Sequence, residues 1–213
     1  MSSIFGEFIQ SLEKELKKPL PGEEAQLLMA PQHRKSELEL YSYDKDYRSS
    51  AILIPLYYKE GAIYTTFIKR TKDKSAHSEQ ISFAGGKSDP EDSSSEETAI
   101  REAEEEIGLK RKDIKILGAL TELYIPVSQF KVLPFVAALD INPKFTPNSL
   151  EVAEIIEERI EILIHEKIKG IKEIIMRNGR IINAPYFDIK GHIVWGATAM
   201  ILSEFITIIK KIY

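Results

Sequence analysis

The spacing of apolar residues along the chain predicts both helices and strands. Between residues 4 and 12 the apolar positions repeat at helical spacing, and Pro19-Leu20-Pro21-Gly22 ends this pattern. We expect the helix either to pack within the chain or to form a contact in a homodimer. We therefore divide the chain into an N-terminal helix and linker, residues 1–22, and a single larger domain, residues 23–213.

Strand-like segments alternate with helical ones through the larger domain. Residues 51–70 contain two apolar, β-branched runs separated by Lys59-Glu60-Gly61, which predicts a β-hairpin. Further strand-like segments are residues 113–123, residues 130–139, the first half of residues 152–168, and a short strand pair within residues 179–187. Residues 77–97 are polar and rich in glycine and serine, and we expect a loop there. The pattern as a whole predicts the α+β class.

The most apolar stretch of the chain is residues 193–209. It is only marginally long enough to cross a bilayer, and it contains Glu204. We expect a buried helix from about Trp195, with Trp195 and Phe205 as core aromatic residues. The N-terminal segment carries acidic residues and lacks a leading basic region, so it does not resemble a signal peptide. We therefore expect a cytoplasmic protein without a membrane partner.

The composition narrows the possible chemistry. The chain has 213 residues, of which 43% are apolar and 29% are charged, as in ordinary globular proteins. The net charge of −4 gives no indication of a nucleic acid partner. The sequence contains no cysteine, which excludes disulfides, thiolate metal sites and cysteine nucleophiles. Any metal ion must therefore be held by oxygen or imidazole ligands.

Residues 101–108, REAEEEIG, form an unusually acidic end of a predicted helix. Ser94 and Glu97 fit a capping box, so the helix should begin near residue 95, and Gly108 should end it. The acidic residues stand at the C-terminal end, where the helix dipole favours lysine and arginine instead. A solvated charged face is one explanation for this pattern, and a bound cation is another.

Three of these glutamates, Glu102, Glu105 and Glu106, fall within one arc of roughly 100° on the helix, so we expect their carboxylates to converge. Arg101 lies on the Glu105 side, where it would neutralise one carboxylate and orient it. A divalent cation would supply the missing positive charge, and oxygen ligands suit Mg²⁺ or Mn²⁺. The glycine pair at 85–86, just before the helix, would let the backbone approach a ligand closely.

The segment from residue 86 to residue 109 resembles the Nudix box of the Nudix hydrolase family, G-x5-E-x7-R-E-U-x-E-E-x-G-U, in which U is a bulky apolar residue. The matching positions are Gly86-x5-Asp92-x8-Arg101-Glu102-Ala103-x-Glu105-Glu106-x-Gly108-Leu109. The sequence departs from the pattern by one inserted residue before Arg101, by Asp92 in place of glutamate, and by Ala103 at the first U position. The core R-E-x-x-E-E-x-G is intact.

This resemblance implies an α/β/α sandwich around a mixed β-sheet, with residues 23–213 as one Nudix domain. It further implies that Glu102, Glu105 and Glu106 bind Mg²⁺ or Mn²⁺, with the Gly86 carbonyl as another ligand. By the same analogy Arg101, Glu102 and Glu105 take part in catalysis, in which water attacks a phosphorus atom of a diphosphate. The general base is left open, and its candidates are Glu151 and Glu154.

A narrower resemblance is to the coenzyme A pyrophosphatase branch of the family. This branch carries the signature L-L-T-x-R-[SA]-x3-R-x3-G-x3-F-P-G-G, and the later segments SQFKVLPFVA and VWGATAMIL are also similar to it. The substrate-binding residues that it implies here are Arg70, Phe83, Gly85, Ser128 and Phe130. Departures from the signature include Ser75 in place of arginine, Glu79 in place of glycine and Ala84 in place of proline.

The leading hypothesis is therefore hydrolysis of coenzyme A or acyl-CoA to 3′,5′-ADP and 4′-phosphopantetheine or its acyl derivative. A second hypothesis keeps the chemistry but takes ADP-ribose, NADH or another nucleoside diphosphate derivative as the substrate. The departures at Ser75 and Glu79 keep it open. A third is a Nudix-fold nucleotide-binding module without catalysis, and the intact glutamates at 102, 105 and 106 argue against it.

Overall fold

The computed structural model describes residues 3–32, 34, 47–72, 78–126, 128–175, 179 and 181–213. The helices are α1 (Ser3–Leu16), α2 (Gly22–Leu27), α4 (Ser95–Ile107), α5 (Ile160–Leu163) and α6 (Gly196–Ile209), with 3-10 helices at Arg111–Asp113 and Glu166–Ile168. The strands are β1 (Arg48–Lys59), β2 (Ala62–Arg70), β3 (Ile81–Ser82), β4 (Ala84–Lys87), β5 (Ile114–Ala119), β6 (Leu123–Ile125), β7 (Phe130–Leu139), β8 (Val152–Arg159), β9 (Lys169–Ile175), β10 (Ile181–Ile189) and β11 (His192–Trp195).

An eight-stranded mixed sheet forms the centre of the molecule. Its main path is β3-β2-β1-β7-β5, with β4 also beside β1, β6 beside β7 and β8 beside β2. Strands β1 and β7 are parallel, with Leu53 opposite Phe135, and the other pairs are antiparallel. Strands β9, β10 and β11 form a separate three-stranded antiparallel sheet.

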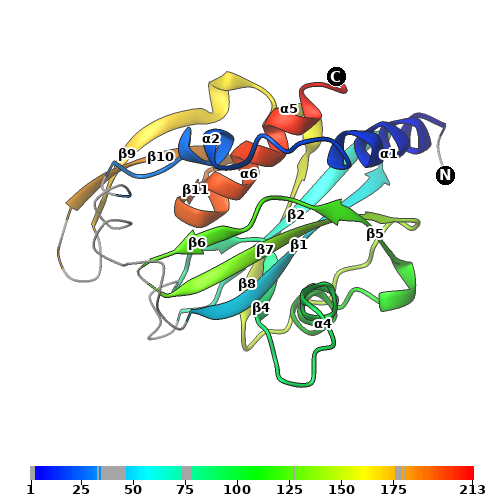
Figure 1. Ribbon diagram of the computed structural model, residues 1–213, viewed down its shortest axis with the longest axis horizontal. Helices are drawn as coiled ribbons and strands as arrows, with labels where there is room; N and C mark the ends of the chain where they lie inside the picture. Colours follow the sequence, from blue (N-terminus) through cyan, green and yellow to red (C-terminus); the bar gives the residue numbers. More distant parts are fainter. Residues whose placement is uncertain are drawn as a thin grey trace.

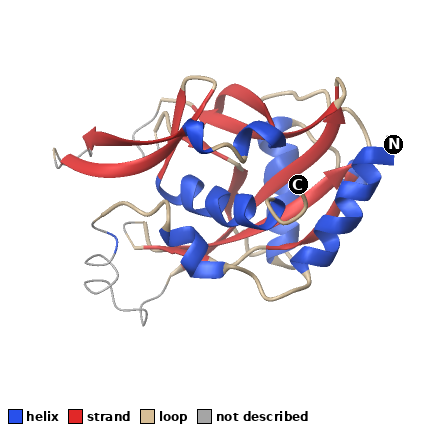
Figure 2. Ribbon diagram, turned by 90° about the horizontal axis from the view of Figure 1, so that it is seen from above, coloured by secondary structure: helices blue, strands red, loops and turns tan. Residues whose placement is uncertain are grey.

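Helices cover both faces of the central sheet. Helix α4 lies on one face, whereas α1, α2 and α6 lie on the other (Figure 1). Strand β1 is buried along most of its length, as expected for an apolar strand that is covered on both sides. The view from above shows the β9–β10 hairpin extending beyond the body of the molecule (Figure 2). The predicted α+β class and the α/β/α sandwich around a mixed sheet are confirmed.

The N-terminal helix α1 belongs to the main apolar core. Its inward face carries Phe5, Phe8, Ile9 and Leu12, all of which are buried. The helix contacts β5 and α6, so the first and last helices of the described chain share one core. Packing within the chain is therefore confirmed for this helix. The homodimer and the domain boundary at residue 22 stay predictions.

Helix α6 is anchored by a buried carboxylate. Glu204 has no exposed surface and accepts hydrogen bonds from the Gly22 N–H at 3.1 Å, Gln26 Nε2 at 2.9 Å and Thr121 Oγ1 at 2.6 Å. These bonds join α2 and the segment before β6 to the final helix. The predicted buried terminal helix is confirmed. In the described part of the chain, no helix is long and apolar enough to cross a membrane.

The predicted hairpin and strands at β1, β2, β5, β7 and β8 are present, and Lys59 pairs with Ala62 across the turn. Two predictions were wrong. The described residues 179 and 181–187 do not contain a strand pair, because their apolar part runs within the single strand β10, whose partners are β9 and β11. The segment before α4 is not only a loop, because residues 84–87 form β4 and pair with β1 through long-range hydrogen bonds.

Candidate active site

The acidic helix begins and ends close to the predicted positions. Ser94 is the N-cap residue, and its Oγ accepts a hydrogen bond from the Glu97 N–H at 3.2 Å. The second half of the capping box does not form, because the Glu97 carboxylate pairs with Arg111 instead. Gly108 ends the helix in the left-handed conformation with φ of 71°. Helix α4 packs against β1 and β4, which places its glutamates beside the glycine pair.

Gly85 and Gly86 allow close approach on two sides of β4. A Cβ atom at Gly85 would overlap the backbone of β1 at Ala51 and Ile52. A Cβ atom at Gly86 would lie 2.5 Å from the carboxylate of Glu102. The glycines therefore permit β4 to pair tightly with β1 on one side and to meet the Glu102 carboxylate on the other.

Glu106 is the most deeply buried acid of the helix, with 1% of its surface exposed. Its carboxylate accepts a hydrogen bond from the Gly85 N–H at 2.9 Å and lies 3.3 Å from Nη1 of Arg70. Burial raises the pKa of Glu106 to about 7, and the negative charges of Glu102 and Glu151 act in the same direction. The hydrogen bond and Arg70 only partly offset this effect.

Glu102 stands one turn before Glu106, and its side chain is 13% exposed. Burial raises its pKa, and the charges of Glu105 and Glu151 add to this effect while Arg101 opposes it. The carboxylates of Glu102 and Glu106 thus lie close together, and the neighbouring arginines do not fully offset the burial and repulsion that raise the pKa of both groups. Glu105 is the outermost of the three, with 54% of its side chain exposed.

Arg101 connects four acceptor groups around the start of this site. Its Nε and Nη2 donate to the two carboxylate oxygens of Asp92 at 2.9 and 3.0 Å. Its Nη1 donates to Glu102 at 2.9 Å and to Glu105 at 3.1 Å, and Nη2 also reaches the Lys87 carbonyl at 3.1 Å. Arg101 therefore lies against two of the glutamates, as its sequence position indicates, and is itself fixed by Asp92.

The sequence reasoning missed the contact between Arg101 and Asp92. Asp92 was identified only as a departure from the Nudix box, together with the inserted residue before Arg101. The bidentate pair lowers the pKa of Asp92, with the Asp89 N–H and the Thr98 hydroxyl as further donors to its carboxylate. A shorter acidic side chain and one extra residue thus still bring a carboxylate to Arg101.

The donor groups beside β4 suit a divalent cation. Glu102 and Glu106 supply two carboxylates of raised pKa, and their mutual repulsion is what a cation would relieve. Hard oxygen ligands of this kind match Mg²⁺ or Mn²⁺. Among the described residues, no three acidic or histidine side chains are positioned to hold an ion together. Binding of metal by Glu102, Glu105, Glu106 and the Gly86 carbonyl stays a prediction.

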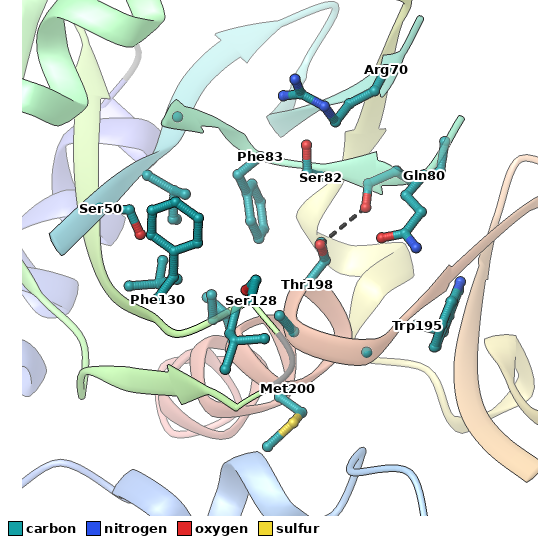
Figure 3. Close-up of a pocket in the computed structure, with 18 of the residues that line it drawn as sticks. Ser50, Arg70, Gln80, Ser82, Phe83, Ser128, Phe130, Trp195, Thr198 and Met200 are labelled. Carbon is teal, nitrogen blue, oxygen red and sulfur yellow. Dashed lines mark hydrogen bonds between the residues drawn. The ribbon is translucent and has the colours of Figure 1, made fainter. Parts of the chain in front are cut away.

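A cavity of about 370 Å³ opens beside these acids. All five predicted substrate-binding residues line it, namely Arg70, Phe83, Gly85, Ser128 and Phe130. Arg70 belongs both to the cavity wall and to the contact with Glu106, so it links the acidic cluster to the cavity (Figure 3). The Ser128 Oγ is buried, and among the described residues it has no hydrogen-bond partner.

The start of α6 forms another wall of the cavity. Trp195, Thr198 and Met200 line the space, and Thr198 Oγ1 donates to the Ile81 carbonyl at 3.0 Å (Figure 3). The prediction that Trp195 is a core aromatic residue was wrong, because its ring borders the cavity and is only partly buried. Phe205, in contrast, is fully buried as predicted. Gln80, Ser82 and Thr198 were missed because only the folded chain brings them to this space.

The departures from the coenzyme A signature have different structural settings. Glu79 is exposed and adopts a φ of 60°, a conformation that glycine adopts most easily. Ala84 is buried at the start of β4. Ser75 lies outside the described residues.

The two candidate bases are also distinguished by their neighbours. The charge of Glu151 contributes to the raised pKa of both Glu102 and Glu106, so Glu151 lies near the acidic cluster. Glu154 instead lies 3.5 Å from Nε2 of His192. Glu151 is therefore the better placed of the two.

Comparisons with known proteins agree with this geometry. Residues 46–165 match the NUDIX domain family. The Nudix hydrolase NudL of Yersinia enterocolitica is 32% identical over 165 residues, which cover 76% of this chain and 81% of the relative. The peroxisomal coenzyme A diphosphatase NUDT7 of Mus musculus is 32% identical over 124 residues, 58% of this chain, and the chain spans about half of that relative, 52%.

A likeness to a solved structure concerns the fold alone. The MutT protein of Methanosarcina mazei Go1 superimposes with a TM-score of 0.50 at 17% identity, covering 78% of this chain and 96% of the other. The family match spans the acidic helix, both glycines, Arg70 and the central strands. On these grounds the chain belongs to the Nudix hydrolase family.

Proposed function

We propose that this Nudix pyrophosphohydrolase cleaves the diphosphate bond of coenzyme A or acyl-CoA, giving 3′,5′-ADP and 4′-phosphopantetheine or its acyl derivative. The observation that carries the proposal is the position of Arg70, a residue of the coenzyme A signature, between the Glu106 carboxylate and the cavity. A relative that is 32% identical over 124 residues bears the name coenzyme A diphosphatase. Both observations favour this substrate class.

Each residue of the site has a distinct role in the proposed reaction. Members of the family generally need a divalent cation, and Glu102, Glu105, Glu106 and the Gly86 carbonyl are the groups that would hold Mg²⁺ or Mn²⁺ here. When bound, the cation supplies Lewis acidity toward a phosphoryl oxygen and lowers the pKa of a coordinated water. Arg101 keeps the carboxylates oriented through charge-assisted hydrogen bonds.

The bond changes are those of a simple hydrolysis. The oxygen of water bonds to one phosphorus atom, the bridging P–O bond breaks, and the leaving phosphate carries the bridging oxygen away. Glu151 is the proposed acceptor of the proton from water, since its charge acts on both Glu102 and Glu106. The guanidinium of Arg70 would bind a phosphate oxygen at the mouth of the cavity.

A second substrate class has its own support. Glu79 is an exposed negative charge where the coenzyme A signature has glycine, and Ser75 replaces an arginine of that signature. Both changes make the region less favourable for the additional 3′-phosphate of coenzyme A. ADP-ribose, NADH and other nucleoside diphosphate derivatives lack that group, and they form the alternative substrate class.

The proposal is tested by incubating the protein with Mg²⁺ or Mn²⁺ and single substrates, and by identifying the products by mass. The panel is coenzyme A, acetyl-CoA, 3′-dephospho-CoA, ADP-ribose, NADH and a dinucleoside polyphosphate. Conversion of coenzyme A to 3′,5′-ADP with the highest kcat/KM supports the proposal. Turnover of ADP-ribose far above coenzyme A would overturn it in favour of the alternative. No turnover of any diphosphate would overturn both and leave a binding module.

A further inference from the structure

The cavity is lined by two parts of the chain, one inside and one outside the segment that matches the NUDIX domain family. Arg70, Phe83 and Phe130 lie within residues 46–165, the segment that matches the family. Trp195 and the first turns of α6 lie outside that segment and form another wall of the same cavity. Arg70, which contacts Glu106 of the acidic cluster, and Trp195, just before α6, lie at separate edges of the cavity (Figure 3), so the wall beside α6 is available to a part of the substrate other than the reacting diphosphate.

The cavity has flat aromatic groups on opposite sides. Phe83 and Phe130 lie on one side and Trp195 on the other, and Arg70, which contacts Glu106, lies at a separate edge (Figure 3). The Phe130 ring carries the Arg48 guanidinium 4.0 Å from its centroid, and the Phe83 ring packs against Phe67 at 4.7 Å. Trp195 is held where β11 pairs with β10, opposite Tyr186. These contacts fix the rings before any ligand binds.

Polar groups lie between the aromatic walls. Gln80, Ser82 and Thr198 line the cavity there, and the hydroxyls of Ser82 and Thr198 can take part in hydrogen bonds with a ligand (Figure 3). Thr198 already donates its proton to the Ile81 carbonyl, so its oxygen remains an acceptor. Flat faces combined with a polar edge suit a planar heterocycle, which stacks and forms hydrogen bonds at the same time. Phe83 is almost fully buried, so Phe130 and Trp195 are the rings that a ligand can contact, and a flexible pantetheine arm makes no comparable use of them.

The size of the cavity fits one part of a dinucleotide-sized substrate. Its volume of about 370 Å³ is near the lower end of the usual range for ligand pockets, roughly 300–1,000 Å³. All the named substrate candidates, coenzyme A, ADP-ribose and NADH, share an adenosine diphosphate half and differ in the other half. A pocket for the shared half would leave the variable half outside.

We propose that this cavity binds the adenine base of the substrate, with Trp195 as the stacking face that sets base specificity. The inference rests on the proposed diphosphate hydrolysis for the orientation of the substrate, with the phosphates toward Arg70. It assigns selectivity to the adenosine side of the scissile bond, and to a residue that lies after residues 46–165, the segment that matches the NUDIX domain family.

Measurements of nucleotide binding test the proposed adenine site without requiring hydrolysis. Trp195 is the single tryptophan of the chain, so its fluorescence reports on this wall alone. Titration with AMP should quench the emission, whereas UMP should bind about tenfold more weakly because its smaller ring stacks less well. Titration with 4′-phosphopantetheine should leave the emission unchanged.

Variants separate stacking from a general effect on folding. Calorimetric titration with AMP should give a dissociation constant about tenfold higher for Trp195→Leu, which removes the flat face, and within about threefold of wild type for Trp195→Phe. In hydrolysis assays, Trp195→Leu should raise KM for an adenine substrate with little change in kcat. Tyr213→Leu, at an exposed aromatic residue near the C-terminus, is the matched control and should leave AMP binding unchanged.

The outcomes distinguish this inference from the proposed reaction. If AMP quenches Trp195 and no diphosphate is hydrolysed, base binding stands and the reaction falls. If hydrolysis occurs but AMP and UMP bind equally, or neither quenches, base recognition by Trp195 is overturned while the reaction stands. Quenching by 4′-phosphopantetheine in place of AMP would overturn it as well, and would assign the cavity to the other half of the substrate.

Discussion

Arg101 holds Asp92 through two parallel hydrogen bonds, of 2.9 Å from Nε and 3.0 Å from Nη2. The same guanidinium contacts Glu102 and Glu105. Asp92 therefore fixes the position of the positively charged group that orients both glutamates. Asp92→Asn should lower kcat and should lower stability by about 1–3 kcal/mol, because a charge-assisted bidentate pair is lost. Urea unfolding and steady-state kinetics measure the two effects, and Asp89→Asn is the control for an exposed aspartate nearby.

The stability effect of Asp92→Asn should depend on pH. Pairing with Arg101 lowers the pKa of Asp92 in the folded protein, so the folded state favours the ionised form. The carboxylate therefore stabilises the fold above the ordinary aspartate pKa, and this contribution is lost as the pH falls toward the lowered pKa. The difference in unfolding free energy between wild type and variant should shrink from pH 7 to pH 3. A difference that stays constant over this range would contradict the assigned pair.

Glu106 should give the opposite pH dependence in metal-free protein. The pKa of Glu106 is about 7 in the folded protein and is lower in the unfolded chain. Between roughly pH 4.5 and 7, Glu106 is therefore protonated in the folded state and ionised in the unfolded state. Its contribution to stability is present at low pH and falls as the pH rises through 7. Glu106→Gln should then stabilise the metal-free protein at pH 8, on the order of 1–3 kcal/mol, and should abolish hydrolysis. Destabilisation at pH 8 would contradict the account of Glu106.

Mg²⁺ or Mn²⁺ should raise the unfolding temperature, because the cation binds the folded acidic cluster and not the unfolded chain. The shift should grow with metal concentration and should be small in Glu105→Gln, which should also lose most activity while remaining folded. Glu96→Gln removes one exposed carboxylate from the first turn of the same helix and should respond as wild type does. Potassium chloride at matched ionic strength checks for simple screening. Full activity in Glu105→Gln would remove that residue from the proposed metal site.

Alanine substitutions at the two glycines should have separate effects. Gly85→Ala should destabilise the protein by about 1–3 kcal/mol, because the added methyl overlaps the backbone of β1. Gly86→Ala meets only the carboxylate end of the Glu102 side chain and no backbone, so the unfolding temperature should change little while metal affinity falls about tenfold or more. Thermal unfolding and metal titration give the two readouts. Equal destabilisation by both substitutions would contradict the packing described for β4.

The two candidate bases are tested as a pair. Glu151→Gln should lower kcat about 100-fold or more, in line with the loss of a general base, with little change in the metal-induced thermal shift. Glu154→Gln, whose parent side chain lies beside His192, should keep wild-type kcat. A large loss of kcat in Glu154→Gln alone would reverse the assignment.

Local patterns were enough to predict the acidic helix. Its N-cap at Ser94 and its end at Gly108 depend on residues a few positions apart, and the Nudix box places its glutamates by helical spacing alone. Strand β4 was missed because glycine has a low strand propensity, and only pairing with β1, far away in the sequence, makes it a strand.

The cavity also shows that local sequence patterns do not predict contacts between distant segments. Arg70, Phe83 and Phe130 could be predicted as substrate-binding residues because they lie in segments that resemble the coenzyme A branch, and all three line one cavity. Trp195 stands in an apolar segment of the sequence, which is typical of a core aromatic residue. Its exposure to the cavity depends on how α6 lies against Ile81 and β11. Periodicity reports which face of an element is apolar, but not which apolar residue borders an opening.

The packing of α1 against α6 has a consequence for the rate of folding. The apolar face of α1, with Phe5 and Phe8, has as its partner a helix that lies far from it in the sequence. Strand β1 must likewise pair with β7 before the centre of the sheet can form. Contacts between segments so distant in the sequence form late, because closing a long loop costs entropy before the contact stabilises the chain. We therefore expect slow folding, in which the apolar face of α1 stays exposed until α6 packs against it.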